Sequence, residues 1–422
     1  MLYTYYGDDF TGSTDVLETL AEAGIPAVLF LAPPSDEDLN QFPNVQAIGI
    51  AGDSRSRSPE WMTANLPEIF RALQSFNAPI IHYKTCSTFD SAPRIGSIGR
   101  AIEIGIDTFH PSFVPIVVAA PHLGRYVLFG NLFAAAGDEV YRIDHHPTMS
   151  RHPVTPMLEP DLRKHLAQQT ALPIALVDIR SITSAAIDDA LATGPAAILF
   201  DGLDEASLEA VGELLWQHAQ QRTLFAIGSS GLTQSLITAW PKPKPSNLTT
   251  QQPTHTHQIL VLSGSCSPVT QSQIEWALAN GFHGIHVNPI DLINDSTMAL
   301  NQTLEALAAG RSPVLYTSLG PLDSTTQPHN KDLGEALGKL LEQILSRSTI
   351  RRTVICGGDT SSHAIQQLPI TALTWLAPVA PGAPLCRAHS ADPMFQHAEF
   401  ILKGGQVGPP NFFEMAMHAG LL

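Results

Sequence analysis

The most suggestive carboxylates of the sequence come directly after its first apolar run. Asp8, Asp9 and Asp15 stand in the segment GDDFTGSTD (residues 7–15), which follows the run Leu2–Tyr6. A carboxylate at a strand end can accept a hydrogen bond from a substrate hydroxyl, or take its proton as a general base. Helix capping and turn formation explain one aspartate and the glycines, but not all three carboxylates. We therefore predict Asp8 and Asp9 as catalytic residues, with Asp9 as the preferred base.

Cations follow two further apolar runs in the same half of the chain. Arg55 comes after the run Val45–Ile50, and Lys84 ends the run Ile80–Lys84. Because ligands of open α/β sheets bind beyond the carboxyl ends of the strands, both cations share one expected location. Either could hold a carboxylate, and arginine does so through two parallel hydrogen bonds. A surface position would explain each cation alone, but the shared location favours an anion site.

A histidine-rich segment, RIDHHPTMSRHP (residues 142–153), leaves several interpretations open. Its three histidines would suit a metal-dependent hydrolase or aldolase. His145 and His146 are neighbours, however, and no HxxxH or HxxEH spacing supports a metal site on a helix. A loop that contacts substrate through Arg151 and His152 is a second interpretation, and an ordinary ordered loop is a third.

Glycine turns with hydroxyl groups follow three predicted strands of the second half. Such turns offer backbone N–H groups and hydroxyls to phosphate, aided by the N-terminus of the next helix. An aspartate in the second turn, Asp359, could help to hold magnesium directly or through water. Any single glycine turn is weak support, but three in one small domain favour a nucleotide site. The predicted nucleotide-binding residues are Ser263, Gly264, Ser265, Gly357, Gly358, Asp359, Thr360, Gly404 and Gly405.

Several large classes of protein are disfavoured by what the sequence lacks. It has no GxxxxGK[ST] motif, no strand-linked GxGxxG and no HRD or DFG set, which argues against P-loop kinases, dinucleotide dehydrogenases and protein kinases. The net charge of −16 argues against a nucleic-acid partner. The cysteines form no CxxC pair, which fits a reducing cytosol. No apolar run approaches the ~20 residues of a membrane span, and no secretory signal is recognisable, so we expect a cytoplasmic protein.

The order of apolar runs and amphipathic segments predicts an α/β fold of two layered domains with mostly parallel sheets and an interdomain cleft. The clearest break is Trp240–His257, which is rich in Pro, Thr and Gln. It predicts a first domain at 1–240, a linker at 241–257 and a second domain at 258–422. The predicted strands are Leu2–Tyr6, Ala27–Leu31, Val45–Ile50, Ile80–Lys84, Val114–Ala119, Ile174–Val177, Ala197–Phe200, Leu224–Ile227, Ile259–Leu262, Gly284–Val287, Val314–Thr317 and Val354–Cys356, and the clearest helices are Asp15–Ala23, Glu205–Ala219 and Asp332–Leu345.

Taken together, these motifs resemble the four-carbon acid sugar kinase family. The segments that carry the resemblance are GDDFTGSTD, YKTCSTFDS and RHPVTPM in the first half, then SGSCSPVTQ, GGDTS and LKGGQVG in the second. The resemblance runs in order from residue 3 to about residue 415. It implies an N-terminal domain that binds a sugar acid and a C-terminal domain that binds the nucleotide. It also implies phosphorylation of the terminal hydroxyl of acids such as threonate, erythronate or 3-oxo-tetronate, with ATP and magnesium.

The resemblance assigns roles to individual residues. Asp8, Asp9, Arg55, Lys84, Ser87 and Asp90 would line the sugar-acid pocket, and Ser263, the turn 357–360 and Gly404 would contact ATP. Two segments depart from the family pattern. Gly96-Ser97-Ile98-Gly99 lacks an Asn that many members have second, and the tail from Gly408 to Phe413 lacks an acidic residue before its aromatics. Both departures leave the kinase class intact and the substrate open, and they indicate a divergent branch.

The expected mechanism is phosphoryl transfer in a cleft that closes over both substrates and excludes water. A small-molecule acid and ATP would be the partners, and a homodimer is the common state of metabolic enzymes. Two other functions stay open: the metal-dependent hydrolase or aldolase, and a sensor that keeps the fold and binds nucleotide without turnover.

Overall fold

The computed structural model describes residues 1–152, 154–241, 252–320 and 330–420. The chain divides into two compact units, and each draws on more than one stretch of sequence. The first unit comprises Met1–Asp8, Thr19–Ala27 and Asn44–Ser246, and the second comprises Asp9–Glu18, Val28–Pro43 and Asn247–Leu422. Helix α1 (Phe10–Glu22) therefore contributes to both. The predicted linker at 241–257 lies mostly at 242–251, outside the described residues.

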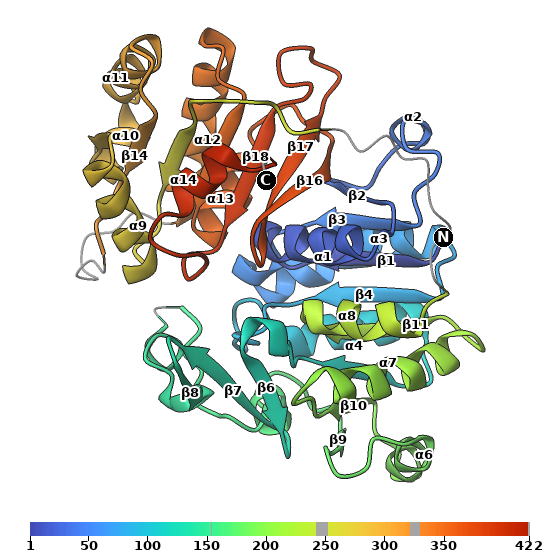
Figure 1. Ribbon diagram of the computed structural model, residues 1–422. Helices are drawn as coiled ribbons and strands as arrows, with labels where there is room; N and C mark the ends of the chain where they lie inside the picture. Colours follow the sequence, from blue (N-terminus) through green and yellow to red (C-terminus); the bar gives the residue numbers. More distant parts are fainter. Residues whose placement is uncertain (153, 242–251, 321–329, 421–422) are drawn as a thin grey trace. The chain divides into compact units, whose positions relative to one another are not determined.

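A parallel sheet forms the centre of the first unit (Figure 1). Its strand order is β3-β1-β4-β11-β5-β10-β9, and every described pairing in it is parallel. These strands are apolar runs, as expected where helices cover both faces of a sheet. Their bounds are β1 Tyr3–Gly7, β3 Ala47–Ala51, β4 Ile80–Lys84, β5 Val114–Val117, β9 Ile174–Val177, β10 Ala197–Phe200 and β11 Leu224–Gly228.

Helices cover both faces of this sheet. Successive side chains of a strand point to opposite faces. Accordingly, Tyr6 of β1 packs against Phe70, whereas Tyr3 packs against Trp240. The helix pair α3–α4 therefore lies on one face and α7–α8 on the other (Figure 1). The helices are α3 Pro59–Ser75, α4 Ile98–Phe109, α5 Leu162–Ala167, α6 Ser184–Leu191, α7 Glu205–Ala219 and α8 Ser230–Ala239.

A small antiparallel sheet also belongs to the first unit. It consists of β6 (Arg125–Leu128), β7 (Asn131–Ala136) and β8 (Glu139–Arg142) in sequence order. Asp201, at the end of β10, accepts the backbone N–H groups of Phe129 and Gly130 and so holds the turn between β6 and β7.

The second unit contains a mixed sheet in the order β13-β14-β12-β15-β18-β17-β16-β2. The strands from β13 to β18 pair in parallel, and those from β18 to β2 pair antiparallel. Thus β2 from the N-terminal part completes the sheet, through Leu29 and Phe30 against β16. The strands are β2 Ala27–Phe30, β12 Leu260–Ser263, β13 His283–His286, β14 Pro313–Tyr316, β15 Arg352–Cys356, β16 Ala372–Ala380, β17 Ala383–His389 and β18 Glu399–Lys403.

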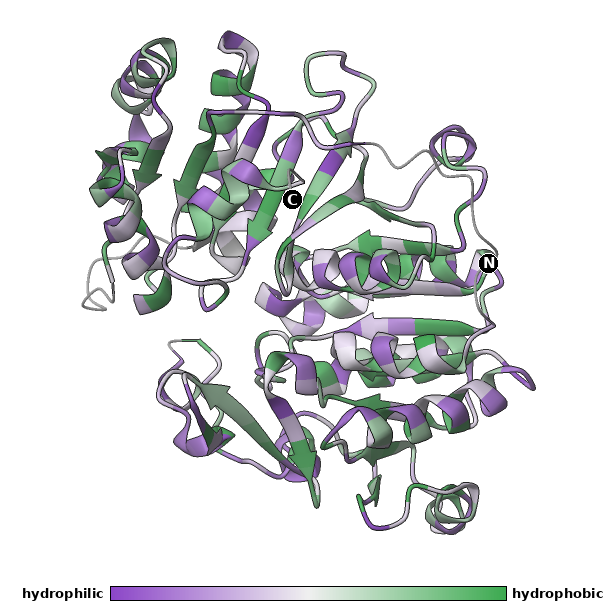
Figure 2. Ribbon diagram, in the orientation of Figure 1, coloured by the Kyte–Doolittle hydropathy of each residue, from purple (hydrophilic) through white to green (hydrophobic). Residues whose placement is uncertain are grey.

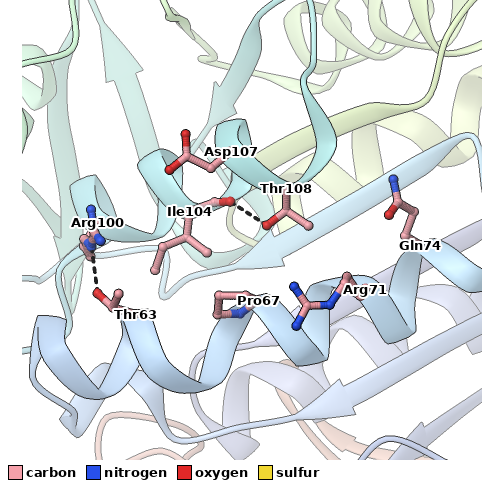
Figure 3. Close-up of a pocket in the computed structure, with 8 residues that line it drawn as sticks. All are labelled: Thr63, Pro67, Arg71, Gln74, Arg100, Ile104, Asp107 and Thr108. Carbon is pink, nitrogen blue, oxygen red and sulfur yellow. Dashed lines mark hydrogen bonds between the residues drawn. The ribbon is translucent and has the colours of Figure 1, made fainter.

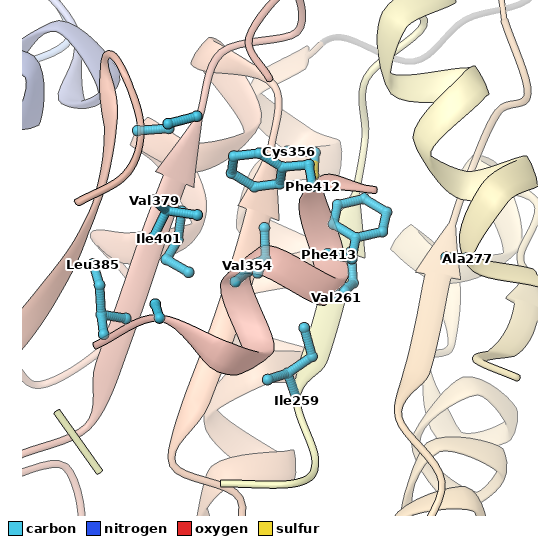
Figure 4. Packing of buried hydrophobic residues seen from close by; sticks show 14 of the residues in the cluster. Ile259, Val261, Ala277, Val354, Cys356, Val379, Leu385, Ile401, Phe412 and Phe413 are labelled. Carbon is cyan, nitrogen blue, oxygen red and sulfur yellow. The ribbon is translucent and has the colours of Figure 1, made fainter. Parts of the chain in front are cut away.

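An apolar core joins this sheet to its helices. Phe412 and Phe413 of α14 pack over Val261 and Val354 of the central strands (Figure 4). Figure 2 shows that many strands are apolar, whereas the helices beside them also carry polar residues. The helices are α2 Asp36–Asn40, α9 Pro268–Ala279, α10 Pro289–Asn294, α11 Thr297–Ala308, α12 Asn330–Arg347, α13 Gly358–Ile365 and α14 Phe412–His418.

The predicted α/β class with mostly parallel sheets is confirmed. Strands Ile80–Lys84, Ile174–Val177 and Ala197–Phe200 and helix Glu205–Ala219 have the predicted bounds. The first helix begins at Phe10 rather than Asp15, because the Asp9 carboxylate accepts the Gly12 N–H and caps it there. No helix of the described residues is long and apolar enough to cross a membrane.

Candidate active site

Three strand ends of the first unit bring predicted site residues together. Gly7, the last residue of β1, is in register with Ala51 of β3 and Lys84 of β4. The Asp8 N–H donates to the Lys84 carbonyl over 3.0 Å, and the Asp8 carbonyl accepts the Arg55 N–H over 3.1 Å. Asp8 and Lys84 are buried, with 4% and 2% exposed. Carboxylate, ammonium and guanidinium groups therefore come from adjacent backbone segments.

Asp90 is the hydrogen-bonding centre of this cluster. Its Oδ2 accepts from the Arg55 guanidinium at 2.7 Å and from the Thr155 hydroxyl at 2.9 Å. Its Oδ1 accepts from the Thr88 hydroxyl at 2.5 Å. Burial alone would raise the pKa of Asp90, but the Arg55 charge, the nearby His152 and these hydrogen bonds hold that pKa well below its ordinary value. Asp90 is thus a fixed anion that can orient Arg55.

Backbone packing also fixes Arg55. Gly96 adopts a φ of +59°, and a side chain there would overlap the Arg55 carbonyl. The Gly96 N–H donates to the Arg57 carbonyl at 2.8 Å. The glycine that opens the divergent Gly96–Gly99 segment is therefore needed where it packs against the arginine turn.

Buried hydroxyl groups lie close to the same strand ends. The Ser54 hydroxyl bonds the Tyr83 phenol at 2.8 Å, and Tyr83 stacks on Tyr6 with ring centroids 5.7 Å apart. Burial raises the pKa of Tyr83, and the Asp8 charge raises it further, so the phenol stays neutral beside the carboxylate. Sequence reasoning missed both tyrosines, because apolar strands often contain tyrosine for packing alone.

The histidine-rich segment is held by its own turns. His146 Nδ1 accepts the N–H groups of Thr148 and Met149 at 3.2 Å each, and His152 Nδ1 accepts the Thr155 N–H at 3.0 Å. Among the described residues, no group of three His, Cys, Asp or Glu side chains could hold a metal ion. The segment instead connects to the strand-end cluster, since Thr155 bonds both His152 and Asp90.

Not every predicted residue joins this network. Ser87 is half-buried on the loop between Lys84 and Asp90, and Arg151 is exposed on a short 3-10 turn. Thr88 and Thr155 join it although neither was predicted. A signal for both was available, because they stand in the segments KTCSTFD and RHPVTPM.

The three predicted glycine turns converge in the second unit. Ser263, Cys356 and Lys403 end the adjacent parallel strands β12, β15 and β18 in register. A methyl group added at Gly264 would lie 2.5 Å from Thr360 Oγ1, and one at Gly405 would lie 3.0 Å from Ser265 Oγ. The turns are therefore packed against one another, at the sheet edge where α/β proteins bind ligands.

The turn after β15 is suited to an anion. Gly357 has a φ of +112° and precedes α13 without a side-chain cap. The first N–H groups of a helix have no partner within the helix, and they carry partial positive charge. A phosphate can satisfy them where no side chain does. The Asp359 side chain lies outside what the structure describes.

Asp9 lies beside this turn, within the second unit. Its Oδ1 accepts the Gly12 N–H at 2.6 Å, and its Oδ2 accepts the Thr11 hydroxyl at 2.9 Å. The Phe10 N–H donates to Ser362 Oγ of α13 at 3.2 Å. A methyl group at Gly358 would lie 3.4 Å from Asp9 Oδ2. Asp9 therefore caps α1 and also presents a carboxylate to the glycine turn.

A separate pocket lies on the helical layer of the first unit. It is lined by residues of α3 and α4, and Arg100 in it donates to the Thr63 hydroxyl (Figure 3). None of the predicted site residues lines it, and its Arg100 also pairs with Glu103. The predicted site residues thus lie at the strand ends and not in this pocket.

Comparison with known protein families identifies two domains in this chain. A family described as a sugar-binding N-terminal domain matches residues 3–236. A family described as a nucleotide-binding C-terminal domain matches residues 260–413. The clusters at Asp8, Arg55 and Asp90 lie in the first match, and the three glycine turns lie in the second.

Named relatives match along the whole chain. A 3-oxo-isoapionate kinase from Paraburkholderia graminis is 41% identical over 100% of this chain and 95% of its own. A 3-oxo-tetronate kinase from Pectobacterium atrosepticum is 30% identical over 97% of both chains. A solved Salmonella typhimurium structure, described as a putative tRNA synthase, has a TM-score of 0.76 and 25% identity over 98% of each chain. The chain therefore belongs to the four-carbon acid sugar kinase family, and it is a sugar kinase with a sugar-binding and a nucleotide-binding domain.

Proposed function

We propose that this enzyme transfers the γ-phosphoryl group of ATP to the terminal hydroxyl of a 3-oxo sugar acid. The observation that carries the acid part is the buried Asp90 carboxylate, which fixes the Arg55 guanidinium at the strand ends that also hold Lys84. In a chain with a net charge of −16, cations gathered at one site suit an anionic substrate.

Identity along the chain favours one acid over another. The relative named for 3-oxo-isoapionate is 41% identical, whereas those named for 3-oxo-tetronate are 27% to 30% identical. We therefore propose 3-oxo-isoapionate as the first substrate to test and the four-carbon 3-oxo-tetronate as the second. The departures at Gly96–Gly99 and in the tail support a substrate different from that of most family members.

In the sugar-binding domain, Arg55 and Lys84 would hold the carboxylate of the acid. Asp90 would mainly position Arg55, because three described protein donors already bond its two oxygens and leave room for about one more hydrogen bond. Further contacts to the hydroxyls of the acid are proposed for Ser87, Arg151 and His152.

In the nucleotide-binding domain, the three converging turns would hold the ATP phosphates. The residues fit a magnesium ion held mainly by phosphate oxygens, because such an ion needs only one or two protein carboxylates. Asp359 is our proposed ligand, and Asp9 Oδ2 lies beside the same turn. Magnesium bound there would offset the negative charge of the phosphates. The proposed ATP contacts are Ser263, Gly264, Ser265, Gly357, Gly358, Thr360, Gly404 and Gly405.

Proton transfer is assigned to the aspartate pair. As the terminal oxygen of the acid bonds to the γ-phosphorus and ADP leaves, the hydroxyl proton would pass to Asp9, with Asp8 as the alternative acceptor. Positioning and charge neutralisation supply most of the catalysis in phosphoryl transfer, so an Asn variant need not be inactive. We expect Asp9→Asn to lower kcat more than Asp8→Asn does. Equal turnover of Asp9→Asn and wild type would remove Asp9 from this role.

A coupled ADP-release assay tests the proposal. Purified enzyme with magnesium-ATP is offered 3-oxo-isoapionate, both enantiomers of 3-oxo-tetronate, and D- and L-forms of threonate and erythronate. We expect the highest kcat/KM with 3-oxo-isoapionate. Without any acid, ADP release should stay at background. Preference for a non-oxidised acid would overturn the substrate assignment. Bound ATP without turnover on any acid would favour the sensor instead.

A further inference from the structure

Lys403 is a fully buried lysine at the base of the nucleotide turns. It ends β18, directly before Gly404-Gly405, and its exposed fraction is 0%. Its Nζ donates to the Gly404 carbonyl at 2.9 Å and to the Thr270 hydroxyl of α9 at 3.2 Å. The same ammonium lies 5.6 Å from the centre of the Phe412 ring of α14. The ammonium is thus surrounded by a carbonyl group, a hydroxyl group and an aromatic ring, none of which carries a charge.

This environment is unfavourable for a charge. Among the described residues, no carboxylate forms an ion pair with Lys403, and burial lowers the pKa of its ammonium to about 8. The titratable group that acts on it is the Cys356 thiol of β15, which stays neutral because burial raises its pKa to about 11. Thr270 and Phe412, which face it from α9 and α14, carry no charge. A buried cation that weakens the fold calls for a function that needs it.

Hydrogen bonds connect this ammonium to the turns. The Thr270 hydroxyl that accepts from Lys403 donates to the Gly405 carbonyl at 3.0 Å. Gly405 in turn packs against Ser265 of the first turn. The other buried cation of this sheet, Arg352, begins β15, whereas the turns follow the opposite ends of the strands. Among the described residues, Lys403 is therefore the buried cation on the phosphate side.

We propose that Lys403 is a positioning residue for the nucleotide: it holds the Gly404-Gly405 turn against α9 and places a fixed positive charge beneath the triphosphate. This inference rests on the proposed function of the three turns. It explains why the protein keeps a charge where an apolar side chain would pack more favourably. It also predicts that nucleotide binding weakens as the ammonium loses its proton.

The test compares Lys403→Met with wild type and with Lys339→Met, a control that changes an exposed lysine of α12. We expect Lys403→Met to raise the KM for ATP about tenfold or more, with a smaller change in the KM for the acid. Its Tm at pH 7 should not fall below that of wild type, because the unfavourable buried charge is gone. Lys339→Met should change neither quantity.

A pH series separates the proposed role from a structural one. The wild-type KM for ATP should rise between pH 7 and pH 9, and that of Lys403→Met should stay flat. A lower Tm with an unchanged KM for ATP would overturn the proposal, since Lys403 would then serve only the fold. If Lys403→Met is insoluble, Thr270→Val and the wild-type pH series replace it. A wild-type KM for ATP that does not change with pH, together with an unchanged KM for ATP in Thr270→Val, also overturns the proposal.

Nucleotide titrations distinguish a failure of this proposal from a failure of the proposed function. If no acid supports turnover, the same variants are titrated with a fluorescent N-methylanthraniloyl derivative of ATP. Tighter binding by wild type than by Lys403→Met would then keep the positioning role while the acid assignment is lost. Equal binding by both would reject the positioning role.

Discussion

At the scale of single residues, two neighbouring arginines show how partners decide function. Arg55 and Arg57 occupy the same short turn after β3. Arg57 pairs with Asp53, and its guanidinium lies 5.1 Å from the centre of the Trp61 ring. Arg55 pairs instead with Asp90, whose side chain is 0% exposed. Asp53 is buried too, but Asp90 also accepts hydrogen bonds from Thr88 and Thr155 and so ties Arg55 to the strand-end cluster. Arg55 is therefore the arginine that we propose for carboxylate recognition.

This contrast predicts a selective effect of Arg55→Lys. Lysine keeps the charge but loses the fork that binds two oxygens at once. Losing one charge-assisted hydrogen bond costs about 1.5–3 kcal/mol, so we expect the KM for the acid to rise roughly 10- to 150-fold. The KM for ATP should change little. Steady-state kinetics with Arg57→Lys as the matched control would measure this. A larger effect of Arg57→Lys would contradict it.

The residue types of the site were predictable, but their partners were not. Asp8, Arg55 and Lys84 could be predicted because apolar strands end beside them. Nothing local in the sequence shows that Asp90 bonds Thr155, because the chain between them forms several other elements. The substrate contact predicted for Asp90 stays a prediction, and its hydrogen bonds add that it can orient Arg55.

At the scale of elements, predictability follows the pairing of the strands. Strands such as Ala197–Phe200 are buried at every position and read as continuous apolar runs. The strands of the small sheet were missed because Glu139–Arg142 is largely exposed and has no apolar pattern. β16 and β17 were missed because they pair antiparallel within a region read as alternating parallel units. The parallel strands of this chain are visible in the sequence as apolar runs, and its antiparallel strands are much less so.

Close packing of α7 on α8 predicts a cost for one added methyl group. A side chain at Gly212 would overlap the Ser235 carbonyl of α8. Alanine favours a helix by up to about 1 kcal/mol over glycine, but overpacking against backbone costs about 1–3 kcal/mol. We therefore expect Gly212→Ala to lower the urea midpoint. Glu213→Ala, at an exposed position of the same helix, should not. An unchanged midpoint for Gly212→Ala would mean that α8 shifts freely.

A buried ion pair anchors the C-terminal helix. Arg352 bonds Glu399 at 2.8 Å and also donates to the carbonyls of Ala416, Met417 and Thr254. Removing one partner of such a pair costs about 3–5 kcal/mol where the remaining charge has no other partner, but Arg387 lies 3.8 Å from the Glu399 carboxylate and offsets part of that cost. We expect Arg352→Met to destabilise the protein by up to about 3 kcal/mol in urea unfolding.

The controls for this ion pair are the exposed neighbour and the double variant. Arg351→Met should change stability little, because Arg351 is exposed. Adding Glu399→Gln to Arg352→Met should recover part of the loss, since it removes a buried carboxylate whose remaining cationic partner, Arg387, is 3.8 Å away. If the double variant were less stable than Arg352→Met, the carbonyl contacts of Arg352 rather than its charge would dominate.

At the scale of the whole molecule, both compact units contain histidines that are neutral when folded. Burial lowers the pKa of His82 to about 3 and that of His165 to about 4 in the first unit. Burial also lowers the pKa of His389 to about 4 in the second. In an unfolded chain the same groups titrate near the ordinary histidine value of about 6.5. Between these values the unfolded chain binds more protons than the folded one.

Acid should therefore destabilise the enzyme well above the range where its carboxylates titrate. The stability contributed by each buried histidine is complete above about pH 6.5 and is lost as the pH falls towards 4. The expected slope is about 1.4 kcal/mol per pH unit for each histidine. Urea unfolding at pH 7.5, 6 and 5 measures it. His165→Gln keeps a side chain that can still bond Ser91, and it should lower the slope by the contribution of one histidine, about 1.4 kcal/mol per pH unit. His145→Gln changes an exposed side chain and should leave the slope unchanged. Equal slopes for His165→Gln and wild type would mean that His165 is protonated in the folded enzyme.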